Sequence, residues 1–123
     1  MSAARLSTGA PDWVGRTVCV AGIGVSGRAA AGALLRLGAE VTVVDGRSGP
    51  DELAHAEALT ELGAKVLLGE GERVPHGTQA VVTSPGWRPA APLLASARRA
   101  GVPVLGEVEL AWLLRRAGGR SGA

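Results

Sequence analysis

The fold of this chain is decided by Thr17-Val-Cys-Val-Ala21 and the glycine-rich turn that follows it, Gly22-Ile-Gly24-Val-Ser-Gly27. The first stretch is almost wholly apolar, which is typical of a strand buried on both faces of a sheet. The spacing G-x-G-x-x-G then allows a tight turn, a close approach of backbone to phosphate, and close packing of the next helix on the strand. We therefore predict a strand–turn–helix unit with an anion site where the helix begins.

Outward from this unit, apolar runs alternate with helical patterns along the whole chain. Four further strands are predicted at 40–45, 65–68, 80–83 and 102–105, and helices at 26–37, 51–62, 91–100 and 107–117. The polar stretch 69–79 is interpreted as a loop. Such alternation predicts an α/β fold, a Rossmann-like doubly wound five-stranded parallel sheet of order 3-2-1-4-5 with helices on both faces.

Spacing within the helical patterns predicts which side chains face the core. The second helix carries apolar residues at spacing three, namely Leu53, Ala56, Leu59 and Leu62. In the last helix we expect Val108, Ala111 and Leu114 to point inward.

Composition excludes several classes of protein. A chain of 123 residues with 46% hydrophobic and 20% charged residues is one globular domain. Its net charge is only +2, and its arginines are scattered without interleaved aromatics, so we expect no nucleic-acid partner. No apolar run approaches the roughly 20 residues of a membrane span, so no membrane partner is expected.

Cys19 is the single cysteine, which rules out a disulfide within the chain and favours a reducing, cytoplasmic location. Its position in an apolar strand predicts a buried structural thiol rather than a nucleophile. We interpret residues 1–13 as a flexible leader, 14–117 as the domain, and 118–123 as a linker to an ATPase domain absent from this chain.

Three groups of residues are candidates for the ligand site. The first is the glycine-rich turn, where the amides of Val25, Ser26 and Gly27 would point at phosphates; the competing interpretation is a turn that only packs. The second is Asp45, at the end of the second predicted strand, where an acid bonds a ribose hydroxyl in NAD-binding domains. Alternatively, Asp45 only starts a turn with Gly46. Arg47 beside it could face a phosphate, stack on a base, or remain a solvated surface side chain.

The third candidate is Ser84-Pro85-Gly86, which follows the fourth predicted strand. In the predicted sheet order this strand neighbours the first one across the switch point, so the loop would face the same ligand. Taken alone, a Ser-Pro-Gly segment indicates only a turn.

Signs of catalysis are missing from the sequence. There is no G-x-x-x-x-G-K-[ST] phosphate loop, and His55 and His76 lie in unrelated segments without a CxxC motif. Glu107 and Glu109 do not share a helix face, and a charge that favours the helix N-terminus explains Glu107. We therefore assign no catalytic residue and no metal ligand.

Taken together, GIGVSG, VVDGR, VTSPGWRP and PVLGEVELAWLL resemble the N-terminal UDP-binding domain of the Mur ligases, in the branch that adds D-glutamate. The resemblance covers about Val14 to Arg116. It implies that the domain binds UDP-N-acetylmuramoyl-L-alanine. The implied ligand contacts are Gly24, Val25, Ser26 and Gly27 on the diphosphate, Asp45, Gly46 and Arg47 around the uracil, and Ser84, Pro85 and Gly86 along the diphosphate and sugar. Gly46 stands where the resemblance leads us to expect a hydroxyl residue.

The resemblance also implies a longer parent enzyme that uses ATP and Mg²⁺ in cytoplasmic peptidoglycan synthesis. The ATP phosphate loop of the family begins shortly after this domain, so we expect the chain alone to be an inactive monomer that binds neither cofactor. Three alternatives remain open from the residues: an NAD(H)-binding module of a dehydrogenase or regulatory protein, a sister Mur ligase with another UDP-sugar, and a non-catalytic interaction domain.

Overall fold

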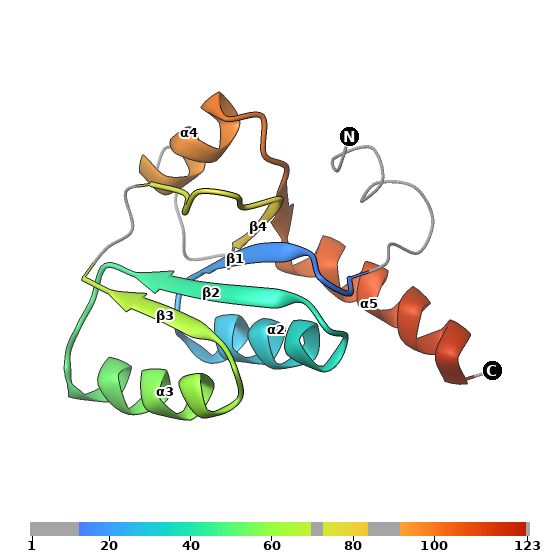
Figure 1. Ribbon diagram of the computed structural model, residues 1–123, viewed down its shortest axis with the longest axis horizontal. Helices are drawn as coiled ribbons and strands as arrows, with labels where there is room; N and C mark the ends of the chain where they lie inside the picture. The colour runs from blue at the N-terminus through green and yellow to red at the C-terminus, as the bar shows by residue number, and fades with distance from the viewer. Residues whose placement is uncertain (1–12, 70–72, 84–91, 123) are drawn as a thin grey trace.

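A parallel sheet of five strands forms the centre of the computed structural model, which describes residues 13–69, 73–83 and 92–122. The strand order is β3-β2-β1-β4-β5, which confirms the predicted order (Figure 1). The strands are β1 (Thr17–Ala21), β2 (Glu40–Asp45), β3 (Lys65–Leu68), β4 (Ala80–Thr83) and β5 (Val104–Gly106).

The switch point lies at β1, which pairs with β2 on one side and with β4 on the other. Ala21 at the end of β1 is aligned with Val44 in β2 and with Thr83 in β4. The carboxyl ends of these three strands therefore meet at one edge of the sheet, where open α/β folds bind their ligands.

Helices cover both faces, three on one side and one on the other, within the described part of the chain. They are α2 (Val25–Arg36), α3 (Pro50–Glu61), α4 (Pro92–Arg99) and α5 (Glu107–Gly122). Side chains of α2, α3 and α5 share one core cluster with the sheet, whereas those of α4 pack in the second cluster. The predicted helices on both faces are thus confirmed.

Alternation along β1 assigns its side chains to these two cores. Val18 and Val20 pack in the cluster under α2, while Cys19 and Ala21 pack in the cluster under α4. All four are at most 1% exposed, because helices or covering segments pack against each face. The apolar run Thr17–Ala21 is therefore a strand buried on both faces of the sheet, as its composition predicts.

Burial makes Cys19 chemically inert in the folded chain. Its side chain is fully buried, and burial raises the pKa of the thiol from 9.0 to about 12. The thiolate population at neutral pH is then about a thousandfold lower than for an ordinary cysteine. We expect a thiol reagent such as DTNB to label the native chain at the rate of unfolding, and to label it at once in denaturant. Rapid labelling of the native chain would contradict a structural role.

The inward face of α5 differs from the prediction. Val108 is 85% exposed and Ala111 is exposed, whereas Leu110 and Leu113 are buried against the sheet. The predicted face was wrong because α5 begins directly after β5 ends at Gly106, so the strand fixes the rotation of the helix. Leu114 is partly buried at the margin of this core.

The predicted end of the last helix and the predicted apolar face of α3 were also wrong. The last helix continues to Gly122, past the predicted end at 117. In α3 Leu59 is buried, Ala56 is partly buried and Leu53 is 56% exposed, and Leu62 just after the helix is 64% exposed. The reason is that α3 covers β3, the edge strand, so it needs only a narrow apolar stripe. None of the helices in the described ranges is long and apolar enough to cross a membrane.

Candidate nucleotide-binding site

The glycine-rich turn is built on two positions that only glycine can occupy. Gly22 has φ of 106° and donates its N–H to the carbonyl oxygen of Val44 at 2.8 Å, which holds the turn on β2. A Cβ at Gly27 would overlap the carbonyl oxygen of Gly22 and lie 2.9 Å from its carbonyl carbon. The first and third glycines of the motif thus make the tight turn and the close helix packing that their spacing predicts.

The N-terminus of α2 is open toward solvent. Gly24 is its N-cap residue, with no side-chain cap, and no acidic residue lies in the first turn. Val25 is 77% exposed and Gly24 is also exposed. The first N–H groups of a helix carry partial positive charge and lack partners within the helix. This end of α2 can therefore accept an anionic group such as a diphosphate.

By contrast, acidic side chains of the chain itself lie at the positive end of α3. Its first turn contains Asp51 and Glu52, and the Glu52 Oε1 atom accepts the N–H of the N-cap residue Gly49 at 3.0 Å. The two helices start at the same edge of the sheet, and of the two only α2 has no acidic residue in its first turn. The start of α2 is therefore the more favourable place for an anionic group.

Asp45 is turned into the protein and ties β2 to the glycine-rich turn. The residue is only 4% exposed, and its Oδ2 atom accepts the Ile23 N–H at 2.9 Å. Its Oδ1 atom accepts the backbone N–H of Arg47 at 2.8 Å. The Arg47 guanidinium adds two more bonds, from Nε to Oδ1 at 3.0 Å and from Nη2 to Oδ2 at 2.9 Å. Each carboxylate oxygen therefore accepts two hydrogen bonds from the chain itself.

These contacts set the charge state of the pair. Burial alone would raise the pKa of the Asp45 carboxyl, but the hydrogen bonds from Arg47 and from the Ile23 N–H outweigh it and lower the pKa below 3.8. The same hydrogen bond raises the pKa of Arg47. At neutral pH the site thus holds a carboxylate and a guanidinium.

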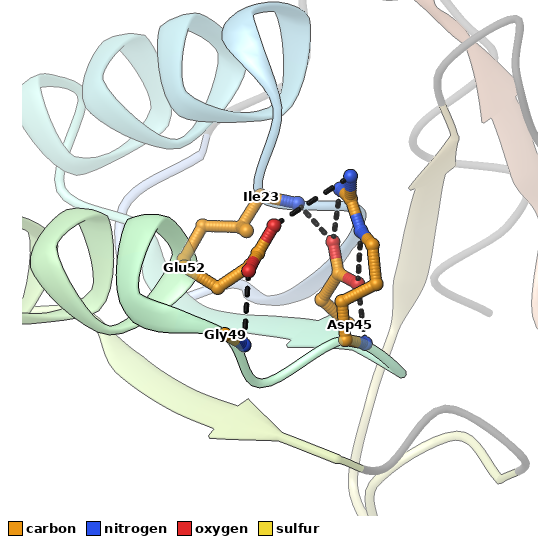
Figure 2. Close-up of polar contacts among 5 residues, drawn as sticks. Ile23, Asp45, Gly49 and Glu52 are labelled. Atoms are coloured by element: carbon orange, nitrogen blue, oxygen red, sulfur yellow. Dashed lines mark hydrogen bonds and ion pairs between the residues drawn. The ribbon is translucent and has the colours of Figure 1, made fainter.

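Arg47 is exposed despite its bonds, and a second carboxylate touches it. Its side chain is 65% exposed, and its Nη1 atom lies 3.7 Å from the Glu52 Oε2 atom. Figure 2 shows the Asp45 carboxylate directed at Ile23, while Glu52 reaches back from α3 toward Gly49. Glu52 was not among the site residues predicted from the sequence. The three-residue spacing from Gly49 to Glu52 was a usable signal, because it is the spacing of a capping box.

The remaining predicted residues are distributed as follows. Val25, Ser26 and Gly27 form the first turn of α2, and Gly46 is exposed beside Asp45. Ser84, Pro85 and Gly86 lie outside the described residues. What the structure does place is the end of β4, since Thr83 is aligned with Ala21 next to the glycine-rich turn.

Glu109 acts locally at the start of α5. Its Oε1 atom accepts the N–H of Gly106 at 3.3 Å, the same relation that Glu52 has with Gly49. Across the residues that the structure describes, no group of three or more His, Cys, Asp and Glu side chains could hold a metal ion. The bond to Gly106 gives Glu109 a role at the start of α5.

A groove of about 650 Å³ lies at the opposite edge of the sheet, where the strands begin. It is lined by Thr17, Glu40, Lys65 and the segment 75–77, among others. None of the candidate residues within the described ranges borders it. The groove is therefore separate from the site at the carboxyl ends of the strands.

Comparison with known proteins identifies the family of this chain. The family model described as "Mur ligase MurD-like, N-terminal domain" matches residues 16–106. The chain is 60% identical over 104 residues to the UDP-N-acetylmuramoylalanine–D-glutamate ligase of Thermobifida fusca, covering 85% of this chain and 22% of that protein. It is 52% identical over 114 residues to the ligase of the same name from Streptomyces coelicolor, covering 91% and 24%. The chain thus spans less than a quarter of the length of these relatives.

Solved structures share the fold at low identity. A 5-ketofructose reductase of Gluconobacter superposes with a TM-score of 0.54 at 18% identity, covering 84% of this chain and 49% of that one. A shikimate 5-dehydrogenase from Mycobacterium fortuitum gives 0.52 at 15% identity, covering 91% and 54%. These likenesses confirm the Rossmann-like architecture alone, whereas the family match covers the glycine-rich turn, Asp45 and β4 together. The chain belongs to the Mur ligase family as a MurD-like N-terminal domain.

Proposed function

We propose that this domain binds UDP-N-acetylmuramoyl-L-alanine for a ligase that adds D-glutamate during peptidoglycan synthesis in the cytoplasm. The observation that carries the proposal is the open N-terminus of α2, held at the switch point by Asp45 in a chain that matches the MurD-like family. A cluster of N–H groups without partners in the helix can bind a diphosphate, and a UDP-sugar contains a diphosphate.

Different groups of site residues contact different parts of the ligand in this proposal. Gly24, Val25, Ser26 and Gly27 bind the diphosphate through backbone N–H groups. Asp45, Gly46 and Arg47 form the uracil side. Because Gly46 has no side chain, we propose that backbone groups contact the base there, with the Arg47 guanidinium alongside.

The third group of proposed contacts is Ser84, Pro85 and Gly86, which would run along the diphosphate and sugar. Their proposed place rests on the alignment of Thr83 with Ala21 beside the glycine-rich turn. The Ser84 hydroxyl would bond the ligand, and Gly86 would let the backbone approach it.

ATP and Mg²⁺ belong to the longer parent enzyme in this proposal. The sequence has no phosphate loop of the G-x-x-x-x-G-K-[ST] type, and the described residues offer no metal-binding cluster. In this proposal the chain contributes substrate binding as a monomer and supplies no catalytic residue. Purified chain should neither hydrolyse ATP above background nor join D-glutamate to the substrate.

A titration followed by amide NMR tests the proposal. With UDP-N-acetylmuramoyl-L-alanine, we expect saturable shifts at Val25, Ser26, Gly27, Gly46 and Arg47, because these amides line the proposed site. NADH, titrated in parallel, should leave them unchanged. Amides of Lys65 and His76 in the opposite groove serve as an internal control and should not move with either ligand.

The two ligands separate the competing functions. Shifts with NADH alone would replace the proposal with a dinucleotide-binding module. The likeness to two dehydrogenases supports only the shared fold, so it does not favour that outcome.

A further inference from the structure

The Arg47 guanidinium is held by two carboxylates from different elements. Asp45, at the end of β2, takes the Nε and Nη2 atoms at 3.0 and 2.9 Å. Glu52, in the first turn of α3, lies 3.7 Å from Nη1, which is an ion pair longer than a hydrogen bond. The two contacts use different edges of the planar group, so together they restrict its rotation more than either does alone.

Glu52 is itself well fixed, unlike most acids at a helix start. Its side chain is only 17% exposed, and its other oxygen accepts the Gly49 N–H at 3.0 Å. A Cβ at Gly49 would lie 2.9 Å from that oxygen, so the glycine leaves room for the carboxylate. One carboxylate thus both starts α3 and faces Arg47.

We propose that Glu52 is a positioning residue for the UDP-binding site, which fixes the Arg47 guanidinium beside the glycine-rich turn while Asp45 fixes its other edge. The inference rests on the proposed function and extends it to a residue that the ligand does not touch. Asp45 connects the two parts, because its Oδ2 atom bonds both the Ile23 N–H and Arg47. A loosened Arg47 would therefore weaken ligand binding from a distance.

Two physical effects of Glu52 oppose each other, and this makes the proposal testable. As a negative charge near a diphosphate, Glu52 should repel the ligand, so its removal would tighten binding. As a positioning residue, it should favour binding, so its removal would weaken it. Glu52→Gln removes the charge behind both effects but keeps the acceptor for the Gly49 N–H at the helix start, so the sign of the change in Kd shows which effect dominates.

The experiment measures the Kd of UDP-N-acetylmuramoyl-L-alanine by calorimetry for the chain and for Glu52→Gln. We expect binding about twofold to fivefold weaker in the variant, the range that an ion pair with one exposed partner contributes. Glu57→Gln is the matched control, because Glu57 is an exposed acid on the same helix and should leave the Kd unchanged. Unchanged or tighter binding by Glu52→Gln would overturn the proposal.

A second background distinguishes positioning from a general effect on α3. In Arg47→Ala, the substitution Glu52→Gln should cause no weakening, because there is no guanidinium left to position. Equal weakening in both backgrounds would show that Glu52 acts through the helix and would overturn the proposal. In the ligand-free chain, the order parameter of the Arg47 Nε–H group should fall in Glu52→Gln and stay unchanged in Glu57→Gln. If the wild-type chain itself fails to bind the UDP-sugar, the proposed function fails; if it binds and Glu52→Gln binds equally well, only the positioning role fails.

Discussion

Replacing Gly27 with alanine should lower the free energy of unfolding by about 3 kcal/mol or more, a large share of the stability of a small domain. The new Cβ would overlap the Gly22 carbonyl oxygen, which is backbone and cannot rotate away as a side chain would. Relief requires α2 to move off β1 or the turn to open. Urea denaturation followed by circular dichroism measures the loss, and binding of the UDP-sugar should disappear with it.

Two other glycines provide matched controls for this substitution. Gly32 lies in the same helix, where an added Cβ would be 3.6 Å from the Arg36 side chain and otherwise free, so Gly32→Ala should stabilise the chain by about 0.5–1 kcal/mol. Gly24 has ordinary φ of −73° and open space around it, so Gly24→Ala should cost only the roughly 1 kcal/mol by which alanine is a poorer N-cap than glycine. Equal stability of Gly27→Ala and Gly24→Ala would contradict the packing role of the third glycine.

Replacing Asp45 with asparagine should cost about 1–3 kcal/mol of stability at neutral pH, the range for hydrogen bonds to a charged group. Asparagine places an NH₂ group where one carboxylate oxygen stands, so it faces either the Ile23 N–H or the backbone N–H of Arg47 as donor against donor. The exposed guanidinium contributes little of this loss, because water screens its ion pair. Urea denaturation at neutral pH measures it.

At acid pH, the difference in the free energy of unfolding between Asp45→Asn and the wild-type chain should become smaller. The pKa of Asp45 is lowered in the folded state, so the unfolded chain takes up the proton first as the pH falls. The stability that Asp45 confers is therefore present at pH values above its ordinary pKa of 3.8, and it is lost as the pH falls through the lower pKa of the folded state. Asp51→Asn is the control, because Asp51 is exposed on α3. If the difference in stability between Asp45→Asn and the wild-type chain stays constant from neutral pH down to about pH 3, the pKa of Asp45 is not lowered.

The sequence by itself determined the sheet and the turn. Strands buried on both faces need mainly apolar residues, and β1 and β4 meet that need almost throughout, so their runs are recognisable without reference to their neighbours. Strand order then follows from right-handed crossovers and the place of the glycine-rich turn. Gly22 and Gly27 were identifiable for a similar reason, because a positive φ and a close helix–strand approach each admit only glycine.

Only the tertiary structure decided which way several side chains point. In α5 two apolar stripes compete, and the direct passage from β5 selects Leu110 and Leu113 over Val108. From the sequence, Asp45 could be interpreted either as a ribose ligand or as a residue that starts a turn. Its orientation toward the Ile23 N–H depends on the alignment of β2 beside β1, which sequence spacing does not encode. The contact between Arg47 and Glu52 likewise needs the loop after β2 to fold back over α3, because ion pairs depend on angles and distances in space.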